Sequence, residues 1–406
     1  MLERTLSLTI KKASRTFPSI VITGPRQSGK TTLLKKLFST THSYYNLESP
    51  DLRLRINEDP IGFLSQIKRP VILDEIQYAP FLLQYIKTFI DKNRKPNQWL
   101  LTGSQNFMLM QNVSESLAGR AAILTLMPLT EIEKIGNGQK SLTSSQMFSL
   151  NKLSIKKLTT DLLTNLLLGS YPEIVVNKKV DRQIWCGSYI NTYLERDIRN
   201  LKQVGDLGEF ERFLRACAVR TGQLLDLSGM AGELGISVST AKRWLSLLQT
   251  GYQIYLLYPY YKNIGKRLIK RPKLYFTDTA LASYLLGLHD KQTLYNSPHF
   301  PALFETFIVI DFLKRFYNFG SLPSLYYLRT RDNLEVDLIL ELEGLLYLLE
   351  IKSSSTIKPK HASSLNRAVN DLGKLVKKAC LISNSPTSFP ISAKVFNYSW
   401  KDLLLT

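Results

Sequence analysis

Nine consecutive residues near the start of the chain combine glycine, lysine and threonine at a spacing that suits phosphate binding. The stretch GPRQSGKTT lies between the apolar run SIVITG and the helical pattern TTLLKKLF. Glycines let the backbone curl, so that successive N–H groups and a helix N-terminus face phosphate oxygens. Lys30 is expected to reach the β- and γ-phosphates of a nucleotide, and the Thr31 hydroxyl to bind Mg²⁺. The candidate nucleotide-binding residues are Gly24, Pro25, Arg26, Gln27, Ser28, Gly29, Lys30, Thr31 and Thr32.

A second stretch, VILDE, supplies the acids that nucleotide hydrolysis needs. Its apolar residues predict a buried strand, and Asp74 at the strand end is a candidate ligand for the same metal ion as Thr31. Glu75 is the candidate catalytic residue that polarises the attacking water. Downstream, LLTGSQN predicts another buried strand, and its Ser104 or Gln105 could sense the γ-phosphate. A helix cap explains Ser104 equally well.

Arg120, in LAGRAAILTL, is an isolated cation just before a further predicted strand. A catalytic role facing the phosphates and an ordinary surface position are both open for it. The sequence also leaves open whether it acts within its own chain or across the boundary of a homo-oligomer.

Near the end of the chain, two strand-like runs carry acids that could bind a metal ion. EVDLILELE alternates between apolar and acidic residues, which predicts a half-exposed strand with Asp337 on its polar face. LLYLLEIK is apolar up to Glu350, which is typical of a strand buried on both faces, and Lys352 follows two positions later. A carboxylate and an ammonium at the end of a buried strand cost desolvation free energy unless they are paired or hold a metal.

An acid, a hairpin and then Glu-x-Lys resemble the PD-(D/E)xK core of restriction-endonuclease-like proteins. The resemblance implies that Asp337 and Glu350 bind Mg²⁺, and that Lys352 orients the water or stabilises the transition-state phosphate. Glu305, in the helical pattern ALFETFIVIDFL, matches the additional acid of that fold. An active nuclease, an inactive binding fold and an unrelated small domain all remain open.

The middle of the chain predicts a winged helix-turn-helix. In LSGMAGELGISVSTAKRWLSLLQTG, apolar residues recur at helical spacing on both sides of a glycine turn. The run KNIGKRLIKRPK, residues 262–273, holds six basic residues and no acid, and would form a basic wing. Such a wing suits DNA phosphates, but a solvated hairpin in a protein-binding module is the alternative. The DNA-binding candidates are Lys242, Arg243, Lys266, Arg267, Lys270 and Arg271.

The helices and strands that carry these residues are expected to form an α/β chain of several domains. Strand and helix patterns alternate up to about residue 130, which predicts a mostly parallel, buried sheet. The last hundred residues predict a helix, three strands, a helix and a final strand. The expected domains are a P-loop ATPase domain (1–150), a helical lid or connector (151–205), the winged helix-turn-helix (206–292) and a restriction-endonuclease-like α/β domain (295–406).

Composition narrows the function further. The 406 residues carry 53 Lys+Arg against 33 Asp+Glu, a formal charge of +20 that favours contact with nucleic acid. Three cysteines without a CxxC pair argue against disulfides and zinc and indicate a reducing compartment. With neither an apolar leader nor a membrane-length apolar run, the chain is expected to be cytoplasmic.

The order of motifs is similar to a large prokaryotic family of AAA+ ATPases with a C-terminal domain of unknown function. GPRQSGKTTL, VILDEIQ, LTGSQ, LAGR and PLTEIE carry the resemblance, which continues through GSYPE, YFTDTALASYLLG and EVDLIL. Family members usually have two glycines where this chain has Gly169 and Ser170, and DTG where it has residues 278–280 as DTA. Neither departure affects the nucleotide motifs.

The sequence therefore predicts an ATPase that hydrolyses ATP with Mg²⁺, associates with DNA and carries a nuclease-like C-terminal domain. The alternative is a nucleotide-dependent switch that gates a protein interaction, with the C-terminal fold as an inactive scaffold. A plain transcriptional regulator that does not turn over ATP is a third interpretation.

Overall fold

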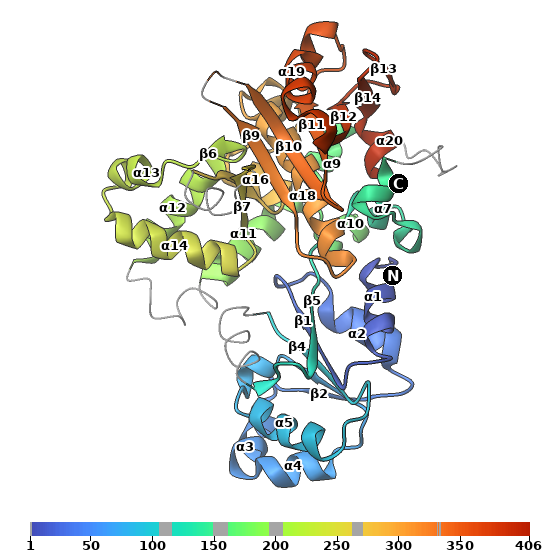
Figure 1. Ribbon diagram of the computed structural model, residues 1–406. Helices are drawn as coiled ribbons and strands as arrows, with labels where there is room; N and C mark the ends of the chain where they lie inside the picture. The colour runs from blue at the N-terminus through green and yellow to red at the C-terminus, as the bar shows by residue number, and fades with distance from the viewer. Residues whose placement is uncertain are drawn as a thin grey trace.

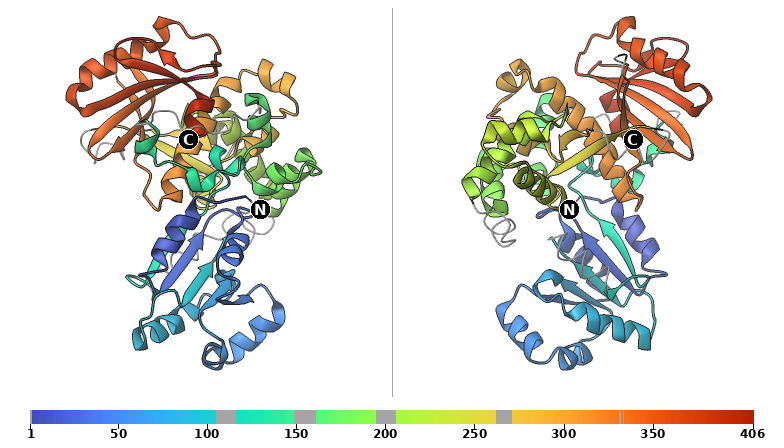
Figure 2. Two further views of the ribbon diagram at one scale, coloured as in Figure 1. Left: turned by 90° about the vertical axis from the view of Figure 1, so that its right-hand side faces the viewer. Right: turned by 60° about the vertical axis from the view of Figure 1, so that its left-hand side comes forward.

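The computed structural model describes residues 2–104, 116–148, 161–194, 206–261, 271–330, 332 and 334–406. These residues form an N-terminal region around a five-stranded sheet and a C-terminal region around a nine-stranded sheet (Figure 1). In the views of Figure 2 the two regions lie at opposite ends of the molecule, and the N-terminus lies at their junction.

The N-terminal sheet is parallel, as the alternating pattern predicted, and its three inner strands are buried. Its strands, in spatial order, are β2 (Ser43–Asn46), β3 (Val71–Asp74), β4 (Trp99–Thr102), β1 (Ser19–Thr23) and β5 (Ala121–Thr125). The helices of this region are α1 (Leu6–Ala13), α2 (Lys30–Phe38), α3 (Pro50–Glu58), α4 (Pro60–Gln66), α5 (Leu82–Lys92) and α7 (Glu131–Lys134). Helices α1 and α2 share an apolar cluster with one face, whereas α3, α4 and α5 share another cluster with the opposite face. Because the strands are parallel, their carboxyl ends lie on one side of the sheet. The P-loop after β1 and Asp74 at the end of β3 are therefore on the same side.

The C-terminal sheet is mixed and crosses two of the predicted domains. In spatial order its strands are β13 (Phe389–Pro390), β14 (Val395–Ser399), β12 (Val376–Ser383), β11 (Leu345–Lys352), β10 (Glu335–Leu342), β9 (Leu325–Arg329), β7 (Ile254–Pro259), β8 (Lys273–Phe276) and β6 (Gln223–Leu224). Strand β7 pairs in parallel with β9, with Tyr258 opposite Tyr326. The strands expected for the wing thus extend the C-terminal sheet across the predicted division at residues 292–295. The domain limits themselves stay predictions.

The helices around this sheet include the predicted helix-turn-helix. They are α8 (Ser144–Met147), α9 (Leu162–Leu168), α10 (Pro172–Val176), α11 (Arg182–Thr192), α12 (Leu207–Val219), α13 (Leu227–Leu234), α14 (Val238–Thr250), α16 (Thr279–Leu285), α17 (Lys291–Asn296), α18 (Phe300–Asn318), α19 (Ser363–Leu372) and α20 (Trp400–Leu404). Gly235 ends α13 with a φ of 69°, a left-handed conformation that glycine adopts readily. Ser237 then caps α14 by accepting a hydrogen bond from the Thr240 backbone N–H at 3.1 Å.

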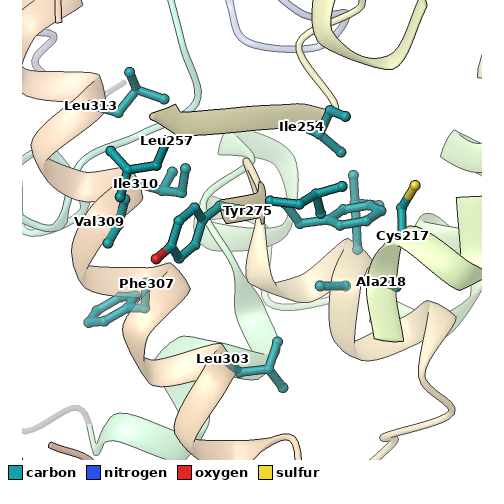
Figure 3. Packing of buried hydrophobic residues seen from close by; sticks show 14 of the residues in the cluster. Cys217, Ala218, Ile254, Leu257, Tyr275, Leu303, Phe307, Val309, Ile310 and Leu313 are labelled. Carbon is teal, nitrogen blue, oxygen red and sulfur yellow. The ribbon is translucent and has the colours of Figure 1, made fainter. Parts of the chain in front are cut away.

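Helix α18 is the centre of the largest apolar cluster. Figure 3 shows side chains of α18, among them Leu303, Phe307 and Ile310, packed toward β7 and toward Tyr275 of β8. The same helix also buries Asp311, Lys314 and Arg315, which contact the segment after β5. A single helix therefore packs on the C-terminal sheet and is bonded to the N-terminal region.

The expectation that β10 is half-exposed is wrong at the strand centre. Five consecutive residues from Val336 to Leu340 are buried, because the strand packs against α19 on one face and against α18 on the other. A register shift between Val336 and Ile339 also interrupts the alternation on which the expectation rested. Asp337 is consequently buried.

No helix within the described residues is long and apolar enough to cross a membrane.

Candidate nucleotide site and acid site

The P-loop has the backbone geometry that phosphate binding requires. Gly24 and Gly29 have φ of 135° and 93°, and a Cβ at Gly24 would lie 2.2 Å from the carbonyl oxygen of Leu126. Only glycine fits at Gly24 without a shift of the backbone. Lys30 begins α2, and its Nζ donates to the carbonyl oxygens of Gly24 (3.0 Å) and Pro25 (2.9 Å). The lysine thus lies within its own loop, held by neutral acceptors.

Asp74 ends β3 and faces the start of α2. Its carboxylate accepts hydrogen bonds from the Thr31 hydroxyl, 2.9 and 3.0 Å from its two oxygens. Thr102 of β4 and Tyr44 of β2, the latter at 2.7 Å, also donate to it. Burial, reinforced by the hydrogen bond to Asp74, raises the pKa of Tyr44. Tyr44 and Thr102 were not found from the sequence, because nothing in their local pattern places them beside Asp74.

The pair of Thr31 and Asp74 fits a magnesium ion that takes its other ligands from elsewhere. Mg²⁺ prefers oxygen ligands and usually binds through one or two carboxylates together with phosphates and water. Within the described ranges, no three His, Cys, Asp or Glu side chains lie close enough together to hold a metal ion alone. These residues therefore fit a Mg²⁺ ion held together with a nucleotide, and not one held in a cage of protein ligands.

Glu75 is held from two sides. It adopts a φ of 58°, which is strained for a residue other than glycine. Its carboxylate accepts hydrogen bonds from the amide of Gln77 and from the Ser104 hydroxyl, the latter at 3.3 Å. Ser104 therefore contacts the candidate base, whereas Gln105 lies outside the described residues. The sequence analysis missed Gln77, although it stands two positions after Glu75.

Arg120 lies at the edge of the sheet opposite the P-loop. It immediately precedes β5, whose first residue Ala121 pairs with Ser19 at the start of β1. The five residues of β1 separate it from the loop by about 16 Å of strand. Its guanidinium pairs with Asp91 at 2.6 Å on the surface. This position does not suit the phosphates of its own chain, and a role across a subunit boundary stays a prediction.

A buried arginine that the sequence analysis missed, Arg4, binds the backbone of the P-loop. Arg4 donates to the Ser28 carbonyl oxygen at 2.8 Å and to the Met127 carbonyl oxygen. Its guanidinium also pairs with buried Glu133 at 3.3 Å, and Glu133 accepts from Asn318 of α18 at 3.3 Å. The other loop residues differ in exposure: Arg26 is partly buried, Gln27 is exposed with a φ of 58°, Ser28 is buried and Thr32 is exposed.

A pocket of about 270 Å³ adjoins the loop at the start of α2. Its lining is mostly apolar and comes from four places in the chain: the N-terminal residues, the start of α2, the segment after β5, and α10. The residues that line this pocket include Leu2, Gly29, Leu33, Leu129, Pro172 and Val176. No sequence motif marks the pocket, because it exists only where α10 meets the N-terminal region.

The four acid-site residues predicted near the C-terminus converge in space. Glu350 and Lys352 pair at 2.6 Å on β11, and Asp337 of β10 accepts from the backbone N–H of Ile351 at 2.8 Å. Glu305 faces them from α18. Burial, with the nearby charge of Asp337, raises the pKa of both Glu305 and Glu350.

The sequence analysis missed a lysine that lies among these acids. Lys273 begins β8, and its side chain is 5% exposed. Its Nζ lies within ion-pair distance of three carboxylates: 3.2 Å from Glu305 Oε1, 2.9 Å from Glu335 Oε1 and 3.7 Å from Asp337 Oδ1. These carboxylates raise the pKa of Lys273 although burial lowers it.

The predicted DNA-binding residues are only partly described. Lys242 and Arg243 are exposed on α14, off its buried face. Arg271 is exposed and lies 3.8 Å from Asp226. Lys266, Arg267 and Lys270 lie outside the described residues.

Comparison with known proteins identifies the N-terminal region as an AAA ATPase domain. Residues 16–134 match the family model described as AAA domain. Residues 159–292 match the domain of unknown function DUF8612, and residues 300–402 match the domain of unknown function DUF4143. The ATPase domain and the C-terminal domain of unknown function, both implied by the sequence resemblance, are confirmed. The restriction-endonuclease-like fold is not confirmed.

The whole chain has curated relatives. It is 30% identical over 404 residues to uncharacterized protein Rv2008c of Mycobacterium tuberculosis and to uncharacterized protein Mb2031c of Mycobacterium bovis. Each match covers 99% of this chain and 85% of the relative, and the chain belongs to the family of these proteins. Among solved structures, the Walker-type ATPase paby2304 of Pyrococcus abyssi matches with a TM-score of 0.45 and 16% identity, covering 70% of this chain and 96% of that one.

Proposed function

We propose that the N-terminal domain binds ATP with Mg²⁺ and hydrolyses it. The contact between Thr31 and Asp74 carries this proposal, because it joins a hydroxyl and a buried carboxylate from two elements beside the P-loop. Mg²⁺, when bound there, would neutralise charge on the β- and γ-phosphates. Lys30 would exchange the two loop carbonyl oxygens for phosphate oxygens.

Glu75 would act as the base toward the attacking water. Gln77 and Ser104 both donate to its carboxylate, which orients it and leaves it able to accept a proton from water. Ser104 is therefore a positioning residue in this proposal.

The apolar pocket beside Gly29 would take the nucleoside base. It lies next to the phosphate loop, and Leu33 and Val176 give it apolar walls from α2 and α10. Since α10 belongs to the segment after the ATPase sheet, a bound base would touch both regions of the molecule.

The test is ATP binding and turnover by Lys30→Ala and Glu75→Gln. Lys30→Ala should lose both, because the γ-phosphate loses its neutralising cation. Glu75→Gln should keep ATP affinity but lose turnover by about 10²-fold or more, as expected for a missing general base. Binding is measured with a fluorescent ATP analogue and turnover by phosphate release. Lys11→Ala, an exposed lysine on α1, and Glu58→Gln, an exposed acid on α3, are matched controls. Unchanged ATP affinity in Lys30→Ala would remove the assignment.

We also propose that the protein acts on DNA, with the acid site as a nuclease-like centre. Two observations support this function. Residues 305, 337, 350 and 352 converge although they come from three elements. Lys242 and Arg243 lie on the exposed face of α14, the second helix of the helix-turn-helix.

The second proposal is tested by plasmid nicking with Mn²⁺ and by ATP turnover with and without DNA. Asp337→Ala should abolish nicking, and Lys242→Ala with Arg243→Ala should lower the salt slope of DNA binding by up to about 2. Lys374→Ala with Lys394→Ala, two exposed lysines, is the charge-matched control. ATP turnover indifferent to DNA, with no nicking, would support the nucleotide-dependent switch instead.

A further inference from the structure

Lys273 occupies the place in the acid site where a metal ion would be expected. Its ammonium lies among carboxylates of α18 and β10, at distances from 2.9 to 3.7 Å. The Tyr275 hydroxyl, from the same strand, donates to Glu305 at 2.5 Å. Strand β8 thus supplies both a cation and a hydrogen-bond donor to acids that lie on other elements.

The described acids do not form a ready metal site. In the part of the chain that the structure describes, no three acidic, histidine or cysteine side chains converge closely enough to hold a metal ion. This finding disagrees with the metal-binding role that the PD-(D/E)xK resemblance implies. The lysine accounts for the disagreement, because it separates and neutralises the carboxylates that would otherwise share a metal.

The cluster nevertheless keeps an unbalanced charge and an unused ligand atom. Four carboxyl groups, those of residues 305, 335, 337 and 350, face the two ammonium groups of residues 273 and 352, an excess of two negative charges when all are ionised. Glu350 is 7% exposed, and its Oε2 accepts no hydrogen bond from any described residue. Its charge interacts with those of Asp337 and Glu305, so this free oxygen belongs to the same cluster. A buried, unsatisfied carboxylate oxygen costs free energy unless a cation binds it.

We propose that Lys273 is a built-in counter-ion of the acid site, which competes with a divalent cation for the carboxylates of Glu305 and Asp337. A cation can bind these acids and Glu350 only when the Lys273 ammonium has left. This inference rests on the proposed role of the acid site, but it concerns cation binding and not cleavage.

The test is Mn²⁺ binding to the full chain without nucleotide, measured as free Mn²⁺ by electron paramagnetic resonance. All variants carry Asp74→Asn, so that the P-loop contributes no metal ligand. Lys273→Met should bind one more Mn²⁺ than its parent, or bind it at least about tenfold more tightly, because an ammonium repels a second cation in the same cluster. Lys273→Arg, which keeps the charge, should behave like the parent. Lys378→Met, a partly buried lysine on β12 outside the cluster, is the control.

Lys273→Met leaves buried carboxylates without their counter-ion, which a bound cation would replace. Its melting temperature should therefore rise with Mn²⁺ while that of the parent does not. If it does not fold, Lys273→Met with Glu335→Gln removes the most exposed carboxylate and keeps the other three. Equal Mn²⁺ binding by the parent and the Lys273→Met variants would overturn the proposal, as would a folded variant without additional Mn²⁺. If the variant binds additional Mn²⁺ but does not nick plasmid DNA, the counter-ion role of Lys273 stands and the proposed nuclease function is wrong.

Discussion

Two buried lysines, Lys30 and Lys273, differ in the acceptors that their ammonium groups contact, and therefore in how easily each can move to another partner. Lys30 donates to carbonyl oxygens of its own loop, which are neutral and belong to residues 24 and 25. Lys273 instead contacts carboxylates contributed by α18 and β10. Hydrogen bonds to charged acceptors are about twice as strong as those to neutral ones. The P-loop lysine can therefore transfer to a phosphate, whereas the acid-site lysine leaves only when another cation replaces it.

The largest expected difference between the two lysines is in stability. Lys273→Ala should lower the free energy of unfolding by about 3–5 kcal/mol, because breaking a buried ion pair leaves uncompensated charge. Lys30→Ala should change it by about 1 kcal/mol or less, since the lysine donates to neutral carbonyl oxygens of its own loop. Urea denaturation of both variants in the presence of EDTA, followed by tryptophan fluorescence, measures the difference. Similar losses for the two variants would show that charged acceptors hold Lys273 no more strongly than neutral acceptors hold Lys30.

A smaller effect should appear in the pH dependence of stability. The pKa values of Glu305 and Glu350 are raised above the ordinary 4.5, so the folded chain keeps protons that the unfolded chain has lost. The free energy of unfolding should therefore fall as pH rises above about 4.5, by at most about 1.4 kcal/mol per pH unit for each such proton.

Glu305→Gln combined with Glu350→Gln should flatten this pH dependence, because neither side chain can then titrate. Denaturation at several pH values measures the slope, with the exposed Glu58→Gln as the control. An unchanged slope in the double variant would show that these two carboxyl groups titrate normally.

The parts of the nucleotide site that lie in one short stretch were predictable from the sequence. The P-loop and the strand that ends in Asp74 each combine a local motif with an apolar strand, and parallel strands bring their ends to one edge. Arg4 and Gln77 could not be found in this way. Arg4 acts through a carbonyl of the loop and a buried acid more than a hundred residues away, and such contacts leave no local pattern.

The sequence identified four residues of the acid site, but it predicted neither the burial of Asp337 nor the presence of Lys273 among the acids. Sequence alternation placed Asp337 on a wet face, whereas in the structure it lies buried beside Lys273 of β8 and the backbone of β11. Lys273 looked like the last member of a basic, solvated run, because its sequence neighbours are basic. Only the pairing of β8 with β7, and of β7 with β9, shows that this lysine faces acids on another element.

The pairing of β7 with β9 also determines where the chain can be cut. A fragment that begins at residue 295 would remove β7 and expose the backbone N–H and C=O groups of β9 along an open edge. Unpaired edges of this kind recruit strands from other molecules and promote aggregation. The same cut would remove the ammonium that neutralises the acids of α18 and β10. Soluble, informative fragments should therefore start upstream of α12, so that one sheet and its counter-ion stay together.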